Sequence, residues 1–394
     1  MASLSCTLLV TAAALLTPLT APAPAAPGCT TSTPYTGGKV GYATYRIPAV
    51  VTTGKGTVLA FAEGRHRVES DTGAIDVVLR RSLDGGCTWG PLAVVAAGKG
   101  DTRGNPAPVV DPRTGHVVLV TSYNSGTVTE AQIMRGEAAP SRTRRVFVQT
   151  STDDGRHFTA PHEITAQVKR PGWRWYATGP GHALALTRGP HTGRLVVPAD
   201  HSAAPPPGSS DTGREFRYYG AHALYSDDGG RTWHIGYSDD SYDGHDNSNE
   251  SGAAQLPDGR IYFTARDQNG KSAGHRLDAR SQDGGATLQR PYAVQHTLDD
   301  VPVVQGSVLQ LHGQAAPLLF SAPSDPAARR AMAIWRSTDG GATFTKALTL
   351  SRKPAAYSDL VQLSGGRLGI LYETGAKGPY DTIVFRRVPL TDVE

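Results

Sequence analysis

The pattern of hydrophobic and polar positions along this chain is that of short strands separated by tight turns. Apolar and polar residues alternate just before a turn in residues 76–81 (DVVLRR), 145–149 (RVFVQ) and 332–336 (MAIWR). A period of two predicts strands that bury one face. Helical spacing is scarce, and only a short helix around residues 129–138 is expected. With 45 glycines and 28 prolines available for turns, the chain is predicted to be all-β.

Five of the turns share one pattern, Ser-x-Asp-x-Gly-x-x followed by an aromatic or aliphatic residue. Asp accepts hydrogen bonds from nearby backbone N–H groups, Gly adopts the unusual backbone angles, and the last residue packs beneath the turn, so these Asp residues are interpreted as structural rather than catalytic. They recur every 55 to 75 residues, which is typical of propeller blades. The turns occupy residues 82–89, 151–158, 226–233, 281–288 and 337–344.

Division of the chain by a repeat of about 60 residues predicts a six-bladed β-propeller, with one blade lacking the turn motif. Residues 203–214 (AAPPPGSSDTGR) are rich in Pro and Ser and are interpreted as a long loop, because the repeat continues beyond them. We therefore expect residues 28–394 to form a single domain.

Residues 1–27 are expected to be a secretory signal. Residues 8–26 (LLVTAAALLTPLTAPAPAA) are apolar over too short a stretch to span a bilayer and then become rich in Ala and Pro, although MASLSC at the start lacks a positive charge. Gly28-Cys29 has the form of a lipoprotein acceptor, but the expected upstream Leu is absent, which disfavours a lipid anchor. The protein is predicted to be secreted.

Three cysteines are present, and Cys6 lies in the expected signal. The remaining pair, Cys29 and Cys87, is predicted to form a disulfide in an oxidising compartment, with two unpaired thiols as the alternative. The formal net charge is only +4 and the basic residues are scattered, which argues against nucleic-acid binding. No His-Glu-x-x-His or Cys-x-x-Cys motif occurs, so neither a metal nor another cofactor is expected.

One further motif, Tyr45-Arg46-Ile47-Pro48, precedes the first strand of the repeat. Together with the five turns, it resembles the sialidase (neuraminidase) family, in which an Arg-Ile-Pro motif and repeated "Asp boxes" occur together. The resemblance extends from about residue 35 to about residue 387. It implies an exo-alpha-sialidase that removes terminal sialic acid from glycoproteins or glycolipids by retaining hydrolysis, acting as a monomer without membrane or nucleic-acid partners.

The resemblance also implies three catalytic residues. Tyr357 matches the family's nucleophile, and Glu250 matches the carboxylate that activates it. A neutral phenol suits this reaction because the anomeric carbon of sialic acid carries a carboxylate, which would repel an attacking Asp or Glu. Asp71 matches the acid/base residue, with Asp76 as a local competitor that strand alternation places in the sheet.

The same resemblance implies a set of binding residues. Three arginines grip the substrate carboxylate, because a planar guanidinium stays charged and binds a carboxylate through paired hydrogen bonds. Other residues orient the first arginine, contact the ring hydroxyls, line the acyl-amide pocket and form an aromatic rim. In that order they are Arg46, Arg266 and Arg329 (with Arg330 as the rival of Arg329), then Glu373, Arg65, Asn105, and Trp173 to Tyr176. For the last segment, the alternative is that its two tryptophans belong to the core of a blade.

Three alternative functions remain at this point. A trans-sialidase would pass the same intermediate to another sugar. A propeller lectin would bind sialic acid without cleaving it, but binding alone requires none of Tyr357, Glu250 and Asp71. A structural scaffold would carry the Asp boxes alone, and the matched arginines argue against it.

Overall fold

A computed structural model describes residues 1, 28–67, 70–271, 273–313 and 315–394 of the chain. The expected signal and Cys6 fall within residues 2–27 and therefore lie outside the described residues. Strands dominate the described part, and the predicted short helix is α1 (Glu130–Met134), which begins after the capping residue Thr129. The other helical segments are α2 (Thr165–Val168) and the 3₁₀ turns η1 (Phe216–Tyr218), η2 (Ala273–His275) and η3 (Leu390–Asp392). None of the helices in the described ranges is long and apolar enough to cross a membrane.

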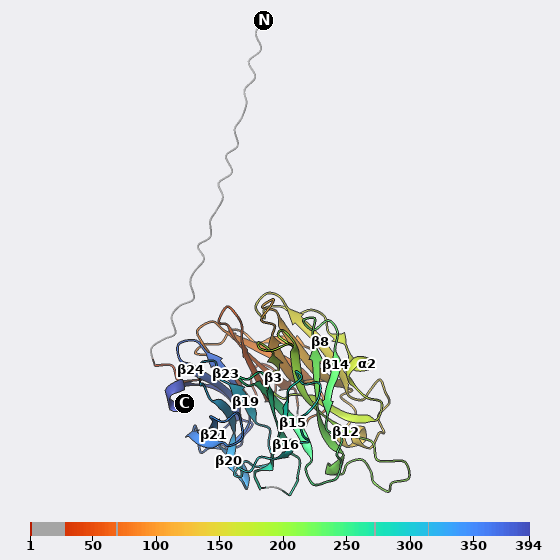
Figure 1. The fold of residues 1–394 in the computed structure, drawn as a ribbon. Helices are drawn as coiled ribbons and strands as arrows, with labels where there is room; N and C mark the ends of the chain where they lie inside the picture. The colour runs from red at the N-terminus through yellow and green to blue at the C-terminus, as the bar shows by residue number, and fades with distance from the viewer. Residues whose placement is uncertain (2–27, 68–69, 272, 314) are drawn as a thin grey trace.

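Hydrogen bonding groups the described strands into five sheets, which follow one another around the molecule (Figure 1). One sheet holds eight strands: β2 (Thr44–Thr52), β3 (Val58–Arg65), β4 (Ile75–Ser82), β5 (Ala93–Ala96), β6 (Thr102–Val110), β7 (Val117–Asn124), β8 (Arg145–Ser151) and β9 (His162–Glu163). The next holds β10 (Trp173–Thr178), β11 (Leu184–Ala185), β12 (Leu195–Ala203), β13 (Tyr219–Ser226) and β14 (His234–Ser238).

The other three sheets have four strands each. They comprise β15 (Ser248–Gln255), β16 (Ile261–Asp267), β17 (Arg276–Ser281) and β18 (Ala293–Val294); β19 (Ser307–Gln310), β20 (Leu318–Asp325), β21 (Ala328–Ser337) and β22 (Thr345–Thr349); and β23 (Ala355–Leu363), β24 (Arg367–Thr374), β25 (Thr382–Pro389) and β1 (Thr31–Thr36). Apolar side chains from facing sheets form the core between them.

The all-β propeller is confirmed, but the prediction of six separate blades is wrong. Four sheets have the size of one blade, with four or five strands each, and the remaining strands form a single sheet of eight. That sheet arises because Ile75 of β4 pairs in parallel with Thr102 of β6 and joins two antiparallel runs, β2 to β5 and β6 to β9. A local repeat pattern cannot reveal a pairing between residues so far apart in the chain.

Each Ser-x-Asp-x-Gly turn links the last two strands of an antiparallel run, and all five share two hydrogen bonds of the Ser hydroxyl. In the first, the Ser82 hydroxyl donates to Asp84 and accepts from the Gly86 N–H, while Asp84 accepts from the N–H groups of Cys87 and Thr88. The Ser–Asp and Gly–Ser bonds recur in the other four turns. The carboxylates are therefore committed to the turns, as the structural interpretation predicts.

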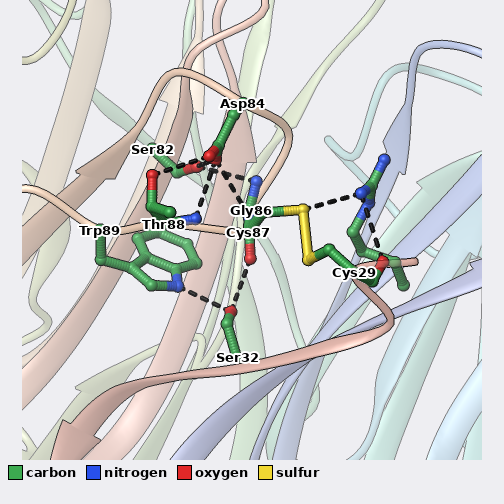
Figure 2. The surroundings of a disulfide bond; sticks show 9 residues. Cys29, Ser32, Ser82, Asp84, Gly86, Cys87, Thr88 and Trp89 are labelled. Atoms are coloured by element: carbon green, nitrogen blue, oxygen red, sulfur yellow. Dashed lines mark hydrogen bonds between the residues drawn. A yellow bond between two sulfur atoms is a disulfide. The ribbon is translucent and has the colours of Figure 1, made fainter. Parts of the chain in front are cut away.

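The N-terminal segment closes the ring of sheets. Strand β1 pairs antiparallel with β25, so the first and last described strands lie side by side (Figure 1). The predicted disulfide is confirmed: Cys29, just before β1, is bonded to Cys87 in the first turn (Figure 2). The indole of Trp89 in that turn donates to the hydroxyl of Ser32 in β1. Because the Cys29 sulfur is in a disulfide, it is not available to carry a lipid.

The buried carboxylate of Asp359 in β23 connects four sheets. It accepts hydrogen bonds from the Val50 N–H in β2 at 2.8 Å, from the Ser307 hydroxyl in β19 at 2.8 Å, and from the His182 N–H before β11 at 2.9 Å. The His182 ring nitrogen Nδ1 lies 2.7 Å from the same carboxylate. Burial alone would lower the pKa of His182, but the charge of Asp359 and this hydrogen bond raise it above its ordinary value.

Removal of the disulfide is expected to destabilise the protein. Cys29 and Cys87 enclose a separation of 58 residues, and the double change of both cysteines to Ser should lower the free energy of unfolding by about 2–4 kcal/mol. Denaturant titration of the parent and the variant measures the difference, and the parent after reduction is the matched control. Equal stability of all three proteins would contradict the closure role of the bond.

The pair of His182 and Asp359 predicts a pH dependence of stability. Because folding raises the pKa of His182, the protonated ring stabilises the folded state. This stabilisation is fully present below the pKa of the unfolded chain, about 6.5, and is lost as the pH rises through the pKa of His182 in the folded protein. The stability difference between the parent and His182→Gln should therefore shrink as the pH is raised from about 6 to about 9. His312→Gln, at an exposed histidine, serves as the control. A difference that stays constant over this range would show that the pair carries no folding-linked proton.

Candidate active site

Five inner strands shift register at the end where the site forms. A bulge leaves one residue unpaired and turns its side chain out of the regular alternation, and bulges are frequent beside active sites. Ile47 and Asn105, at two of these places, have left-handed backbone angles, with φ of 57° and 52°. The shifts lie between Arg46 and Ala49 in β2, Gly104 and Ala107 in β6, Trp173 and Tyr176 in β10, Ser248 and Ser251 in β15, and Ala355 and Ser358 in β23.

The bulged ends surround a polar cavity of about 230 Å³. Of the nine residues that the sequence singled out for catalysis or binding, seven line it, and the other two, Arg65 and Glu373, are buried behind it and bond to lining residues. The structure thus brings together residues that are up to 327 positions apart in the chain. The seven are Arg46, Asp71, Asn105, Glu250, Arg266, Arg329 and Tyr357.

Glu373 in β24 holds two of the inner strands as well as the first arginine. One carboxylate oxygen accepts from Arg46 Nε at 2.9 Å and from the Ile47 N–H at 2.9 Å, and the other accepts from the Tyr357 N–H at 3.1 Å. Burial alone would lower the pKa of Arg46, but the charge of Glu373 raises it well above its ordinary value. Arg46 is therefore a fixed cation at the cavity wall.

Glu63 in β3 likewise binds an arginine and a bulge amide, next to Asp71. It accepts from Arg65 Nε at 2.9 Å and from the bulge N–H of Asn105 at 2.8 Å. Arg65 also donates to Asp71 Oδ1 at 2.8 Å, and the Asp71 side chain is 52% exposed at the mouth of the cavity. Burial alone would raise the pKa of Asp71, but the charges of Arg65 and Arg46 outweigh it and lower the pKa, which favours the ionised carboxylate.

Tyr357 and Glu250 form a hydrogen-bonded pair at the base of the cavity. The phenol donates to Glu250 Oε1 at 2.6 Å, and Arg266 Nη1 lies 3.2 Å from the phenol oxygen and 2.9 Å from Glu250 Oε2. Asn249 Oδ1 accepts from Arg266 Nη2 at 2.6 Å and fixes that guanidinium. Burial and the charge of Glu250 raise the pKa of Tyr357, so the phenol is protonated and its proton points at a base.

The structure separates the two pairs of rivals. Arg329 lines the cavity, whereas Arg330 is exposed and pairs with Asp325 at 3.5 Å. Asp76 lies outside the cavity and accepts hydrogen bonds from the Tyr42 hydroxyl at 2.8 Å and the Gly98 N–H at 2.7 Å. Arg329 rather than Arg330, and Asp71 rather than Asp76, can therefore contact a ligand in the cavity.

The predicted aromatic rim is wrong. Trp173, Trp175 and Tyr176 are all buried. Trp173 stacks on His201, with ring centroids 4.0 Å apart. Trp175 lines the cavity, but the Arg144 guanidinium covers its ring at 3.6 Å. The pattern of strand β10 carries no signal that distinguishes a ring at a rim from one beneath another side chain.

The sequence reasoning missed seven polar residues that line the cavity: Glu63, Glu130, Arg144, Asp200, Tyr219, Asn249 and Gln268. Burial, followed by the charge of Glu250, raises the pKa of Asp200, and burial, followed by the charge of Asp71, raises that of Glu130. Burial lowers the pKa of Arg144 to about 10. Glu130 follows the Thr129 cap of the predicted helix, which was the one available signal.

Ionisable side chains of both signs line the cavity. Four guanidinium groups, a phenol paired with a carboxylate, and a carboxylate at the mouth together suit acid–base and nucleophilic chemistry on an anionic substrate. Across the ranges that the structure describes, no group of three or more His, Cys, Asp or Glu side chains is arranged to hold a metal ion.

Comparison with known proteins places this site in a family. Residues 56–370 match the family described as BNR repeat-like domain. The exo-alpha-sialidase of Aspergillus fumigatus is 30% identical over 385 residues, which cover 89% of this chain and 85% of the relative. The sialidase of Micromonospora viridifaciens is 31% identical over 357 residues, but the match spans only about half of it, 51%, against 86% of this chain.

A solved structure agrees with these relatives. A Hadza microbial sialidase superposes with a TM-score of 0.76 at 26% identity, over 92% of this chain and 69% of that one. Fold and cavity therefore define a BNR-repeat propeller enzyme. The chain belongs to the sialidase family, and its activity is that of an exo-alpha-sialidase, a glycoside hydrolase, as the resemblance implied.

Proposed function

We propose that this enzyme releases terminal sialic acid from glycans by a two-step retaining reaction at the cavity described above. The observation that carries the proposal is the hydrogen bond of 2.6 Å from the Tyr357 phenol to Glu250, beside the arginines that line the same cavity. Sialylated glycans of glycoproteins or glycolipids are the proposed substrates.

In the first step, Arg46, Arg266 and Arg329 bind the carboxylate of sialic acid and hold the anomeric carbon above Tyr357. The phenol transfers its proton to Glu250 as its oxygen forms a bond to that carbon. Arg266, which already contacts the phenol oxygen, stabilises the negative charge that develops there. The bond between the anomeric carbon and the aglycone oxygen breaks at the same time, which leaves a tyrosyl-linked sugar.

Asp71 supplies the proton that the departing oxygen takes up. Arg65 and Arg46 lower its pKa, so a bound substrate must reverse that effect. The substrate carboxylate does so in part, because its negative charge opposes that of the nearby arginines, and the aglycone removes the exposed carboxyl from water. In the second step Asp71 accepts a proton from the water that attacks the anomeric carbon, the bond between that carbon and the Tyr357 oxygen breaks, and Glu250 returns its proton to the phenol as sialic acid is released.

The proposal places this reaction outside the cell. The disulfide between Cys29 and Cys87 is of the kind that persists in oxidising compartments, which supports secretion. Expression of the full chain in a bacterial host with a Sec pathway, followed by N-terminal sequencing of protein from the medium, tests this point. Recovery of the activity solely inside the cells would count against it.

The role of Tyr357 predicts a specific loss. Tyr357→Phe should lower kcat/KM for a sialoside by at least about 1000-fold, because no covalent intermediate forms, while the affinity for free sialic acid stays close to that of the parent. A fluorinated sialic acid donor, which slows the second step, should label the parent, and peptide mass analysis should locate the label. A label on any residue other than Tyr357 would overturn the assignment.

The role of Asp71 predicts a loss that depends on the leaving group. Asp71→Ala should lower kcat/KM by about 100- to 10,000-fold on sialyl-galactose, whose leaving alkoxide is a strong base, and much less on an aryl sialoside, whose phenolate needs little protonation. Arg266→Ala, the control, weakens the grip on the carboxylate and should affect both substrates alike. The ratio of the two substrates' kcat/KM values decides the point, and equal losses in Asp71→Ala would remove it as the acid.

A further inference from the structure

The loop between β24 and β25 brings a second tyrosine, Tyr380, to the arginine cluster. The loop is held in place by Asp381, whose side chain accepts from the Lys377 N–H at 2.8 Å and whose carbonyl accepts from the Gly37 N–H at 2.9 Å. Tyr380 itself is half-buried and packs against the core that contains Ile47 and Tyr357. Its ring is therefore part of a fixed loop at the base of the site.

Tyr380 contacts two of the three arginines that are proposed to bind the carboxylate, Arg46 and Arg329. The Arg46 guanidinium lies over the Tyr380 ring, with its central carbon 4.0 Å from the ring centroid. Arg329 Nη1 donates to the Tyr380 hydroxyl at 3.0 Å. The electron-rich face of the Tyr380 ring contacts the Arg46 cation, and the hydroxyl oxygen accepts a hydrogen bond from the Arg329 cation. The two like charges are thus held next to each other, each with a favourable contact.

The three arginines differ in how their charge is compensated. Arg46 pairs with Glu373, and Arg266 pairs with Glu250. Arg329 forms no ion pair with a carboxylate in the described part of the chain, and its hydrogen bonds go to the Val303 carbonyl at 3.0 Å and to Tyr380. Neutral acceptors fix the direction of a guanidinium without cancelling its charge. Arg329 therefore keeps the most charge available for an incoming anion.

We propose that Tyr380 is a positioning residue for the substrate carboxylate. It orients Arg329 through a neutral hydrogen bond and sets the spacing between Arg329 and Arg46, so that both meet the carboxylate. The inference rests on the proposed function, in which these arginines bind that group. Because the carboxylate is held in the ground state and in the transition state alike, loss of Tyr380 weakens binding and leaves the bond-breaking steps largely intact.

Two substitutions separate the two contacts of Tyr380. Tyr380→Phe keeps the ring beneath Arg46 and removes the acceptor for Arg329, and it should raise KM for an aryl sialoside by about five- to tenfold with kcat within about twofold of the parent. Tyr380→Leu also removes the ring and should raise KM by roughly a further threefold. Calorimetric titration with free sialic acid should show the same losses in affinity.

The control is Tyr292→Phe, which removes a buried phenol hydrogen bond of 2.7 Å to Tyr237 in another sheet, outside the cavity. It should leave both KM and kcat unchanged. If Tyr380→Phe leaves KM and sialic acid affinity as in the parent, or lowers kcat at constant KM as a loss of folded enzyme would, the inference is overturned. Failure of the parent itself to bind sialic acid would instead overturn the proposed function.

Discussion

The site depends on the capture of backbone amides that the bulges set free. A bulge turns a side chain toward the cavity but leaves an N–H group without its strand partner, and a buried N–H without a partner costs about 1–3 kcal/mol. Glu373 captures the amides of Ile47 and Tyr357, and Glu63 captures that of Asn105. The same two carboxylates pair with Arg46 and Arg65. One set of buried acids therefore stabilises the bulged backbone and orients the cations.

The charges that result set the protonation of the two groups proposed to act in the reaction. Burial and Glu250 keep Tyr357 protonated, whereas Arg65 and Arg46 keep Asp71 ionised. A nucleophile with its proton next to a base is ready for the first step, but an ionised acid is not. In the proposed mechanism, the negative charge of a substrate carboxylate shifts this balance in the required direction, so that the acid becomes effective when the substrate is bound. Under that proposal, substrate recognition and acid catalysis depend on the same arginines.

The position of the nucleophile is fixed by a connection on the side away from the cavity. Asp359, two residues after Tyr357, accepts hydrogen bonds from β2, from β19 and from the segment before β11. Three consecutive residues of β23 are tied to other sheets: Tyr357 to Glu250 in β15, Ser358 to Ser321 in β20, and Asp359 to Ser307 in β19. The phenol of Tyr357 is thus held on a backbone that is fixed from several sides, which suits a group that must be accurately aligned.

Local patterns in the sequence were enough to predict the strands, the propeller, the candidate site residues and the disulfide. Alternating polarity predicted the strands, and the five Ser-x-Asp-x-Gly turns predicted the propeller. The Arg46-Ile47-Pro48 motif, with the other motifs matched to the family, identified all nine candidate site residues. Cysteine parity gave the disulfide between Cys29 and Cys87. Each of these depends on residues that are close in the chain or on a motif that can be matched without knowing its surroundings.

The tertiary structure alone decided how distant segments meet. The parallel pairing of Ile75 with Thr102 merged strands into a sheet of eight, and the burial of Trp175 beneath Arg144 removed the expected rim. Glu63, Asp200 and Tyr380 joined the site through contacts across neighbouring strands, sheets and loops. The physical reason is that a bulge, a buried counter-charge or a shared ring is a property of the neighbours in space, and a local pattern holds no record of them.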